Sequence, residues 1–504
     1  MPSRTLPPTH SPTLEPAGDY EKYDPIETTA AHGSRRWWVL AVIALAQLMV
    51  VLDGTIVNIA LPSAQADLGL TDASRSWVVT GYALAFGALL LLGGRIADFW
   101  GRKRAFLTGM VGFALASIVG GLAQSQTELL AARALQGVFA ALLAPAALAI
   151  LTVTFPTGRD RGKAFAVFGA IAGGGAALGL VLGGLLTEYA SWRWCLLVNV
   201  PVAIIAVVAG SRLIVESRAT GNTRYDWPGV VLVAVGLGSL VYGFTEAENG
   251  WTSGPALGFI GLGVVLLALF VLVEARSDHP LLPLHIAAQR DRAGAFLAAL
   301  LTGTAMIGGL LFLTFYLQIV LAYEPIAAGL ASLPMTAAIM VTAAVSAQLM
   351  PKIGPRPLLA VGPVVAAAGL LYLTQLETAG SYAADVLPGM LLLGLGLGMI
   401  FVPLQNIALL GVDPHDSGAA SALVNAAQQI GGSLGTALFS TISLTATAAF
   451  IPADPSSPTA PLDALVAGYT HAFAWAALFL VLITPISLVL VRATKADVGG
   501  ESAI

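Results

Sequence analysis

The sequence has 504 residues, of which 57% are hydrophobic and 10% charged, and its mean hydropathy is +0.83. Such a chain cannot build the polar surface that a water-soluble domain needs, so its composition predicts a membrane protein with many spans. The net charge of -4 says little about partners, because in a membrane protein the distribution of charge matters more than its sum. The single cysteine, Cys195, excludes an intramolecular disulfide and a metal site made of cysteines alone.

Residues 1–34 are polar and rich in proline, threonine and serine, which predicts a disordered cytoplasmic tail. The first apolar run is long enough to span a membrane by itself, so no signal peptide is expected. At about 20 apolar residues per span, we predict fourteen helices, near residues 37–61, 77–92, 105–123, 129–151, 164–186, 195–214, 229–245, 255–274, 293–320, 326–349, 357–376, 385–410, 418–447 and 468–491.

These runs divide the chain into groups of six, two and six. We expect an N-terminal six-helix bundle at 35–215, a linker with two extra transmembrane helices at 216–292 and a C-terminal six-helix bundle at 293–492. A short cytoplasmic tail is expected at 493–504. The predicted fold class is therefore an all-α polytopic membrane protein with two six-helix bundles and fourteen helices in total.

Lysine and arginine are distributed asymmetrically along the chain. Nearly all lie in the tails or in every second connection, whereas the other connections hold only Arg75 and Arg193, and Arg133 lies inside a predicted helix. Because basic residues concentrate on the cytoplasmic side of membranes, both termini are predicted to be cytoplasmic. A wrong helix count would break the alternation, so it favours fourteen spans over twelve.

An internal repeat relates the two halves. The string KIGPR at 352–356 matches FWGRK at 99–103, and glycines at 431–435 match glycines at 175–179 at nearly the same offset. Repeats of this kind are typical of transporters built from two similar bundles. The two extra helices would then be an insertion between the halves.

The connection GGRIADFWGRKR at 93–104 concentrates four positive charges and one aspartate between two apolar runs. Its glycines allow helix ends to approach closely or turn sharply, and its aspartate has cationic neighbours. One interpretation is a charged membrane stop. The spacing favours the other, a conformational latch formed by Gly94, Asp98, Gly101, Arg102 and Lys103.

This loop resembles the G-x3-D-x2-G-R-K/R loop between helices two and three of the major facilitator superfamily of secondary transporters, with Phe99 where many members have a basic residue. Four further strings resemble segments of its fourteen-helix drug-proton antiporter branch. They are LDGTIVNIALP (52–62), RALQGVFAALLAP (133–145), GAALGLVLGG (175–184) and WRWCLLVNVP (192–201). The resemblance covers most of the first half, whereas the second half resembles the family more in its arrangement of helices than in its sequence motifs.

The resemblance implies particular residue roles. Asp53 would be the membrane acid of the first string and Arg133 the arginine of the fourth-helix motif. Leu180 stands where the antiporter motif usually has proline, so close helix packing is expected there without that proline. The glycine face of the antiporter motif would be Gly175, Gly179, Gly183 and Gly184.

Asp53 and Arg133 also stand out on physical grounds. An ionisable group in hydrocarbon is costly, so it usually faces a cavity and has a function. At 1.5 Å per residue, Asp53 lies about 12 Å and Arg133 about 5 to 8 Å from the same membrane face, so contact between the two side chains is possible. We interpret them as proton-coupling residues, because desolvation favours a protonated acid whereas a nearby guanidinium favours the carboxylate. The alternative is a fixed interhelical ion pair.

A polar stripe marks the helix predicted at 418–447. Its members fall within about 100° of one another on a helix. They are Asn425, Gln428, Gln429, Gly432 and Thr436. We expect the three amides, with Gly175 and Gly179, to line a substrate cavity. The alternative is that the amides bond between helices and hold them together.

The leading hypothesis is a proton-coupled antiporter of the cytoplasmic membrane that exports hydrophobic or amphipathic small molecules by alternating access, as in drug or antibiotic resistance. The alternatives are proton-coupled uptake or lipid translocation by the same fold, and a membrane scaffold that does not transport. An enzyme is not expected, because the spans contain no paired acid and base and no metal-ligand spacing. We expect substrate, protons and the bilayer as partners, no nucleic acid, no metal, no cofactor beyond the proton gradient, and a monomer.

Overall fold

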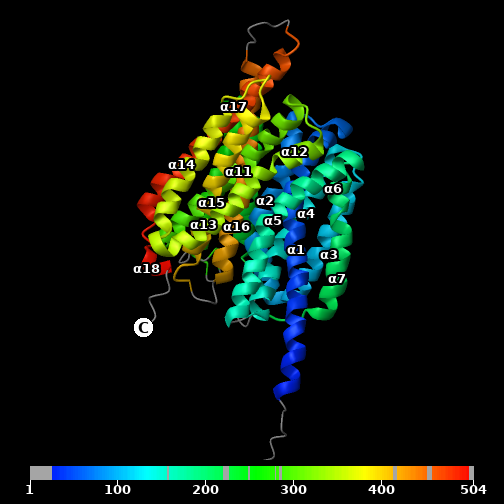
Figure 1. Ribbon diagram of the computed structural model, residues 1–504, viewed down its shortest axis with the longest axis vertical. Coiled ribbons are helices and arrows are strands. Elements are labelled where there is room, and N and C mark those ends of the chain that lie inside the picture. The colour runs from blue at the N-terminus through cyan, green and yellow to red at the C-terminus, as the bar shows by residue number, and fades with distance from the viewer. Residues whose placement is uncertain are drawn as a thin grey trace, which may run out of the picture.

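The computed structural model describes residues 25–155, 158–218, 226–247, 250–277, 280–282, 287–412, 417–450 and 457–498. Within these ranges all regular structure is helical (Figure 1). The first half contains α1 (Pro25–Leu68), α2 (Asp72–Trp100), α3 (Arg102–Gly121), α4 (Gln126–Thr154), α5 (Gly158–Tyr189), α6 (Trp194–Leu197) and α7 (Asn199–Leu213), followed by α8 (Trp227–Glu246) and α9 (Gly254–Glu274). The second half contains α11 (Arg290–Phe315), η2 (Tyr316–Val320), α12 (Pro325–Ala331), α13 (Leu333–Ile353), α14 (Pro355–Leu373), η3 (Tyr382–Val386), α15 (Leu387–Leu409), α16 (Ser417–Ala449), α17 (Ala460–Leu490) and α18 (Lys495–Val498).

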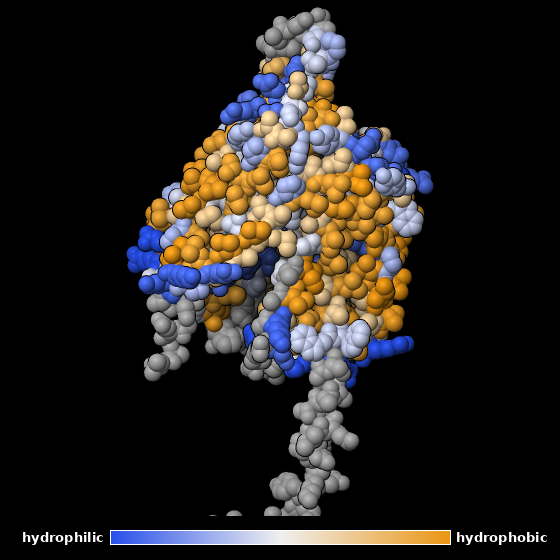
Figure 2. All heavy atoms as spheres, viewed as in Figure 1, coloured by the Kyte–Doolittle hydropathy of each residue, from blue (hydrophilic) through white to orange (hydrophobic). Residues whose placement is uncertain are grey.

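The described ranges contain 13 helices that are long and apolar enough to cross a membrane. Helix α16 has 33 residues but falls outside that set, because its Asn, Gln, Ser, Thr and Gly residues lower its hydropathy. With α16 included, the predicted all-α fold of fourteen helices is confirmed. Figure 2 shows a broad hydrophobic band across the visible face of the molecule with hydrophilic residues toward both ends, the pattern of a multi-pass membrane protein.

The structure shifts several predicted boundaries. Helix α1 begins at Pro25, so residues 25–34 of the predicted disordered tail are helical, while residues 1–24 lie outside the described ranges. The helix predicted at 195–214 is divided into α6 and α7 at Val198. The short run at 77–92 belongs to α2, which continues to Trp100, because isolated charges near a helix end do not stop it.

The helices form two packed groups. Helix α4 packs against α2 and α3, and α1 against α5 and α7; in the second half α11 packs against α16 and α17, and α15 against α13 and α14. Helices α8 and α9 pack against each other, and α8 contacts α2 of the first group and α16 of the second. An apolar cavity of about 220 Å³ remains where α2, α8, α9, α11 and α16 meet.

Helix starts follow from local capping. The Thr71 side chain accepts a hydrogen bond from the Ser74 amide at the start of α2. Ser125 accepts from the amide of Glu128 at the start of α4, and the Glu128 carboxylate accepts from the Gln124 amide at 2.7 Å. These side chains satisfy amides that have no partner inside the helix.

The two ends of the molecule differ in how the groups meet. We call the end where α1 enters and α17 leaves the terminal face, and the other end the opposite face (Figure 1). Toward the opposite face the groups are joined: the Gln318 side chain donates to the Ile59 carbonyl, and the Ile326 amide donates to Glu188, both at 3.0 Å. Figure 2 shows the surface hollowed between the groups on the terminal-face side. This conformation is therefore closed at the opposite face.

Candidate functional site

Five polar side chains from four helices meet inside the first helix group, and we call them the Asp53 cluster. Helix α4 contributes two of them, three residues apart and so on one helix face. The members are Asp53 (α1), Ser117 (α3), Arg133 and Gln136 (α4) and Asn199 (α7), each at most 1% exposed. The structure thus brings together the acid and the arginine that the sequence identified.

The Asp53 carboxylate accepts three hydrogen bonds. Its Oδ2 accepts from Arg133 Nη1 at 2.6 Å. Its Oδ1 accepts from Gln136 Nε2 at 3.0 Å and from Asn199 Nδ2 at 2.8 Å. Ser117 Oγ in turn accepts from both amides, at 2.8 and 3.4 Å. A buried ion pair is tolerated only when its remaining donors and acceptors are satisfied in this way.

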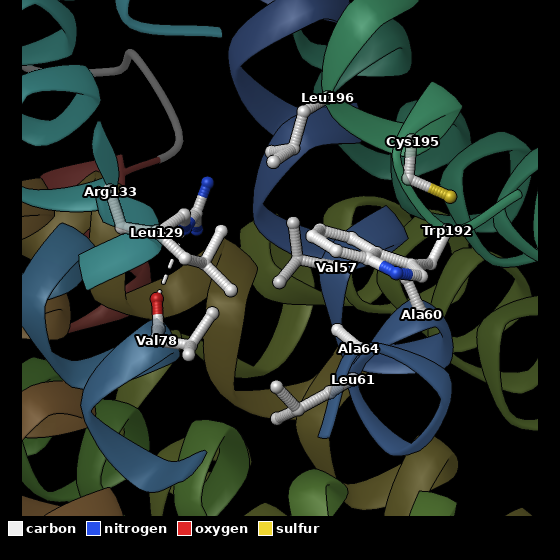
Figure 3. A pocket seen from close by; sticks show the side chains of 10 residues that line it. All are labelled: Val57, Ala60, Leu61, Ala64, Val78, Leu129, Arg133, Trp192, Cys195 and Leu196. Atoms are coloured by element: carbon white, nitrogen blue, oxygen red, sulfur yellow. Dashed lines mark hydrogen bonds between the residues drawn. The ribbon is translucent and has the colours of Figure 1, made fainter. Parts of the chain in front are cut away.

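The Arg133 guanidinium is fixed on several sides. Its Nε donates to the Val78 carbonyl on α2 at 3.0 Å, the contact drawn as a dashed line in Figure 3. Its Nη1 also donates to Gln136 Oε1 at 2.9 Å. Its central carbon lies 4.4 Å from the centroid of the Tyr82 ring, within cation–π range. Arg133 therefore connects α2 and α4 to the carboxylate on α1.

Only one member of the cluster can change its charge. Arginine keeps its proton in proteins, and serine and the two amides do not titrate in the usual pH range. A proton that binds Asp53 removes the charge that Arg133 pairs with and converts one acceptor oxygen into a donor. The cluster can therefore exist in two states with different contacts between α1 and α4.

The structure corrects the connection predicted at 93–104: residues 93–100 belong to α2 and 102–104 to α3, so only Gly101 lies outside a helix, and this turn meets the segment that follows α7. Gly101 ends α2 and begins α3 with φ of 125°, a conformation that favours glycine, and a Cβ there would stand 2.7 Å from the Glu216 carboxylate. That carboxylate accepts from the amides of Lys103 and Arg104 at 3.1 and 3.3 Å. It thereby caps the N-terminus of α3. Lys103 Nζ donates to the Ser211 carbonyl at 2.6 Å.

The remaining latch candidates lie close to one another. Asp98 Oδ1 accepts from Arg102 Nε and Nη2 at 3.1 and 2.8 Å. Gly94 faces Pro145 of α4, with room for a methyl group. The adjacent Gly93 is the tighter contact, because a Cβ there would lie 2.0 Å from the Ala141 carbonyl oxygen.

The glycine face of α5 packs against α1. A Cβ on Gly175 would meet Leu48 and Val51 at 3.2 Å, and one on Gly179 would stand 1.9 Å from Thr55 Oγ1. Both glycines are buried. In this conformation Gly175 and Gly179 lie at a helix contact and not on a cavity wall, because the absent side chains let two backbones approach.

The residues of the predicted polar stripe on α16 become more buried along the helix. Asn425 is exposed, whereas Gln428 and Gln429 are half-buried. The Gln428 backbone lies against Gly303 of α11, and the Gln429 side chain against Gly87 of α2. Two further members pack into the helix contacts: Thr436 is fully buried and bonds its own helix, and Gly432 faces Ile307.

Sequence reasoning missed several polar residues. Gln136, Asn199 and Ser117 are uncharged and so did not stand out in apolar runs, although Arg133 and Gln136 share a helix face. Glu216 lies in a connection, where an acid is common.

Two acids of the extra helix pair form a further buried group that the sequence did not indicate. Asp226 caps α8 by accepting from the Gly229 amide at 2.9 Å. Glu274 is the last residue of α9, as the predicted helix at 255–274 implies, and it is only 3% exposed. It accepts from the Leu282 amide at 2.9 Å and so holds the following connection in place.

Comparisons with known proteins agree with this architecture. Residues 43–436 match the family model described as Major Facilitator Superfamily. The chain is 50% identical over 488 residues to the puromycin resistance protein of Streptomyces alboniger, covering 95% of this chain and 97% of that protein. It is 38% identical over 467 residues to the cephamycin export protein of Amycolatopsis lactamdurans, covering 91% and 94%.

A solved structure shows the same fold. The crystal structure of a bacterial homologue of the human lysosomal transporter Spinster superimposes with a TM-score of 0.63 at 15% identity, covering 92% of this chain and 98% of that chain. The family model and the two relatives confirm the resemblance seen in the sequence motifs. The chain belongs to the Major Facilitator Superfamily of membrane transporters.

Proposed function

We propose that the protein exports a hydrophobic or amphipathic antibiotic in exchange for protons, by alternating access of two bundles at 35–215 and 293–492. The observation that carries the proton part is the fully buried Asp53–Arg133 pair, whose carboxylate is the only titratable member of its cluster. The drug part is supported by relatives named for puromycin resistance and cephamycin export. The transported molecule is not chemically changed, and a monomer works without metal, cofactor or nucleic acid.

In the proposed cycle the terminal face is cytoplasmic, so the hollow receives substrate from the cytoplasm or inner leaflet. Proton binding to Asp53 breaks the bond from Arg133 Nη1 and frees α1 relative to α4. Because the cluster is sealed in this conformation, a proton reaches it only when the bundles rearrange. Substrate is exchanged for protons if the two bind preferentially to different arrangements of the bundles.

Asp98→Asn is expected to slow turnover by about tenfold while substrate binding survives, because the latch acts on the equilibrium between states and not on the substrate. The Asp98–Arg102 pair is partly exposed, with side chains 38% and 18% accessible, so its loss should change stability by less than about 1 kcal/mol. The measurement is the initial export rate beside a binding titration. A variant that loses binding but keeps its turnover per bound molecule would place Asp98 in the binding site.

The export proposal is tested in everted vesicles from a pump-deficient host, with puromycin and lincomycin as probes. An acid interior should drive accumulation of at least one probe, and nigericin should abolish it. Accumulation only in right-side-out vesicles under an inward proton gradient would indicate uptake instead.

Asn425→Ala should alter the preference between the two probes more than it alters the amount of protein in the membrane, since Asn425 is the exposed member of the stripe.

A further inference from the structure

A small cavity separates the Asp53 cluster from the opposite face. Its volume is about 10 Å³, close to the minimum that holds one water molecule. Arg133 stands at one side and the Trp192 ring at the other, with Val57 between them (Figure 3). Apart from Arg133 and the thiol of Cys195, the lining is hydrocarbon or indole, so in this conformation the space offers almost no partners to water.

One face of α1 connects the cluster to the opposite face through this cavity. At 100° per residue, Asp53, Val57, Ala64 and Asp67 share a helix face, and Val57 and Ala64 line the cavity. The distance along the axis from Asp53 to Asp67 is about 21 Å. Asp53 is fully buried, whereas the Asp67 side chain is 48% exposed. The cavity therefore lies along the face of α1 that joins an exposed acid to the buried one.

Trp192 is held in this route by groups near the opposite face. Its indole Nε1 donates to Asp67 Oδ2 at 3.0 Å. Arg193 forms a salt bridge with the same oxygen, and its guanidinium carbon lies 4.5 Å from the Trp192 ring centroid. Arg193 also donates to the Ala123 carbonyl at 2.9 Å. The ring is thus a fixed wall only 6% exposed, although it belongs to a connection between helices.

We propose that Trp192 is the plug of a proton route between the opposite face and Asp53, and that Asp67 and Arg193 hold the plug shut. This inference rests on the proposed exchange of drug for protons. When the ring leaves, water fills the space; a proton relayed from water then forms an O–H bond on the Asp53 carboxylate, which gives up its hydrogen bond from Arg133 Nη1. While the hollow is open at the terminal face the plug is closed, so Asp53 has no route to the opposite face.

Cys195 provides a reporter that is independent of transport. It lines the same cavity, is fully buried and is the only cysteine in the sequence. In proteoliposomes, Trp192→Ala should make its reaction with the small neutral reagent methyl methanethiosulfonate about tenfold faster, because local opening sets the rate of access to a buried group. Trp192→Phe, which keeps most of the ring, should label slowly. The control Trp194→Ala removes a ring that is 51% exposed and should not change the rate.

The second readout is proton leak under an imposed pH gradient without drug. Trp192→Ala should leak protons, and Trp194→Ala should not. If Trp192→Ala fails to fold, Asp67→Asn, which frees the ring without removing it, should give faster labelling of Cys195. Folded variants whose labelling and leak match the unmodified protein would overturn the plug. A protein that never exchanges drug for protons but still shows faster labelling in Trp192→Ala would instead refute the proposed function and leave the plug in place.

Discussion

Asp53→Asn is expected to abolish proton-driven export, because it removes the one group of the buried cluster that can carry a proton. The loss should be complete, with accumulation in vesicles at the level of empty membranes. The control Glu324→Gln removes one negative charge from an exposed position and should leave export intact. Full export by Asp53→Asn would mean that the proton is carried elsewhere.

A second variant separates lost chemistry from lost structure. Asp53→Asn leaves the buried Arg133 without its counter-ion, and breaking a buried pair in this way costs about 3–5 kcal/mol. The double variant Asp53→Asn/Arg133→Gln removes both charges, so it should unfold at a higher temperature than the single variant. Export should remain absent in both. Recovery of proton-driven export with recovered stability would show that the pair only holds the fold together.

Gly93→Ala is expected to have the largest effect on folding, and its neighbour supplies the matched control. A Cβ at Gly93 would lie 2.0 Å from the Ala141 carbonyl oxygen and 2.6 Å from its carbon, so α2 and α4 would have to separate. Overpacking of this kind costs about 1–3 kcal/mol or more. At Gly94 the nearest atom is Pro145 Cβ at 3.6 Å, an ordinary contact.

The measurement is the thermal midpoint and the yield of monodisperse protein in detergent. Gly93→Ala should lower both. Gly94→Ala should match the unmodified protein or exceed it, since alanine is favoured over glycine inside a helix by about 0.5–1 kcal/mol. Equal behaviour of the two variants would contradict the close contact between α2 and α4.

Much of the fold follows from the sequence because hydrocarbon thickness fixes the length of a membrane helix. The apolar runs therefore predict all fourteen spans, including the one at 418–447 that becomes α16, although the amides and hydroxyls of α16 lower its hydropathy below that of the other thirteen. The break at Val198 and the helical start at Pro25 could not be predicted, since neither changes the hydropathy of its surroundings.

The candidate site could be predicted only in part. Asp53 and Arg133 are visible because charge is rare in an apolar span. Gln136 and Asn199 lie 83 and 146 residues from Asp53, and nothing local to either shows that they meet at one carboxylate oxygen. At Gly175 and Gly179 the sequence does not distinguish a cavity wall from a helix contact, because glycine permits both open space and close packing, and only the position of α1 separates the two.

The most direct measurement is proton movement during drug exchange in proteoliposomes with a trapped pH indicator. An imposed drug gradient, without any initial pH gradient, should drive protons in the opposite direction, and the movement should disappear in the Asp53→Asn/Arg133→Gln double variant. Drug movement at the normal rate with no change in the indicator would contradict proton exchange at Asp53.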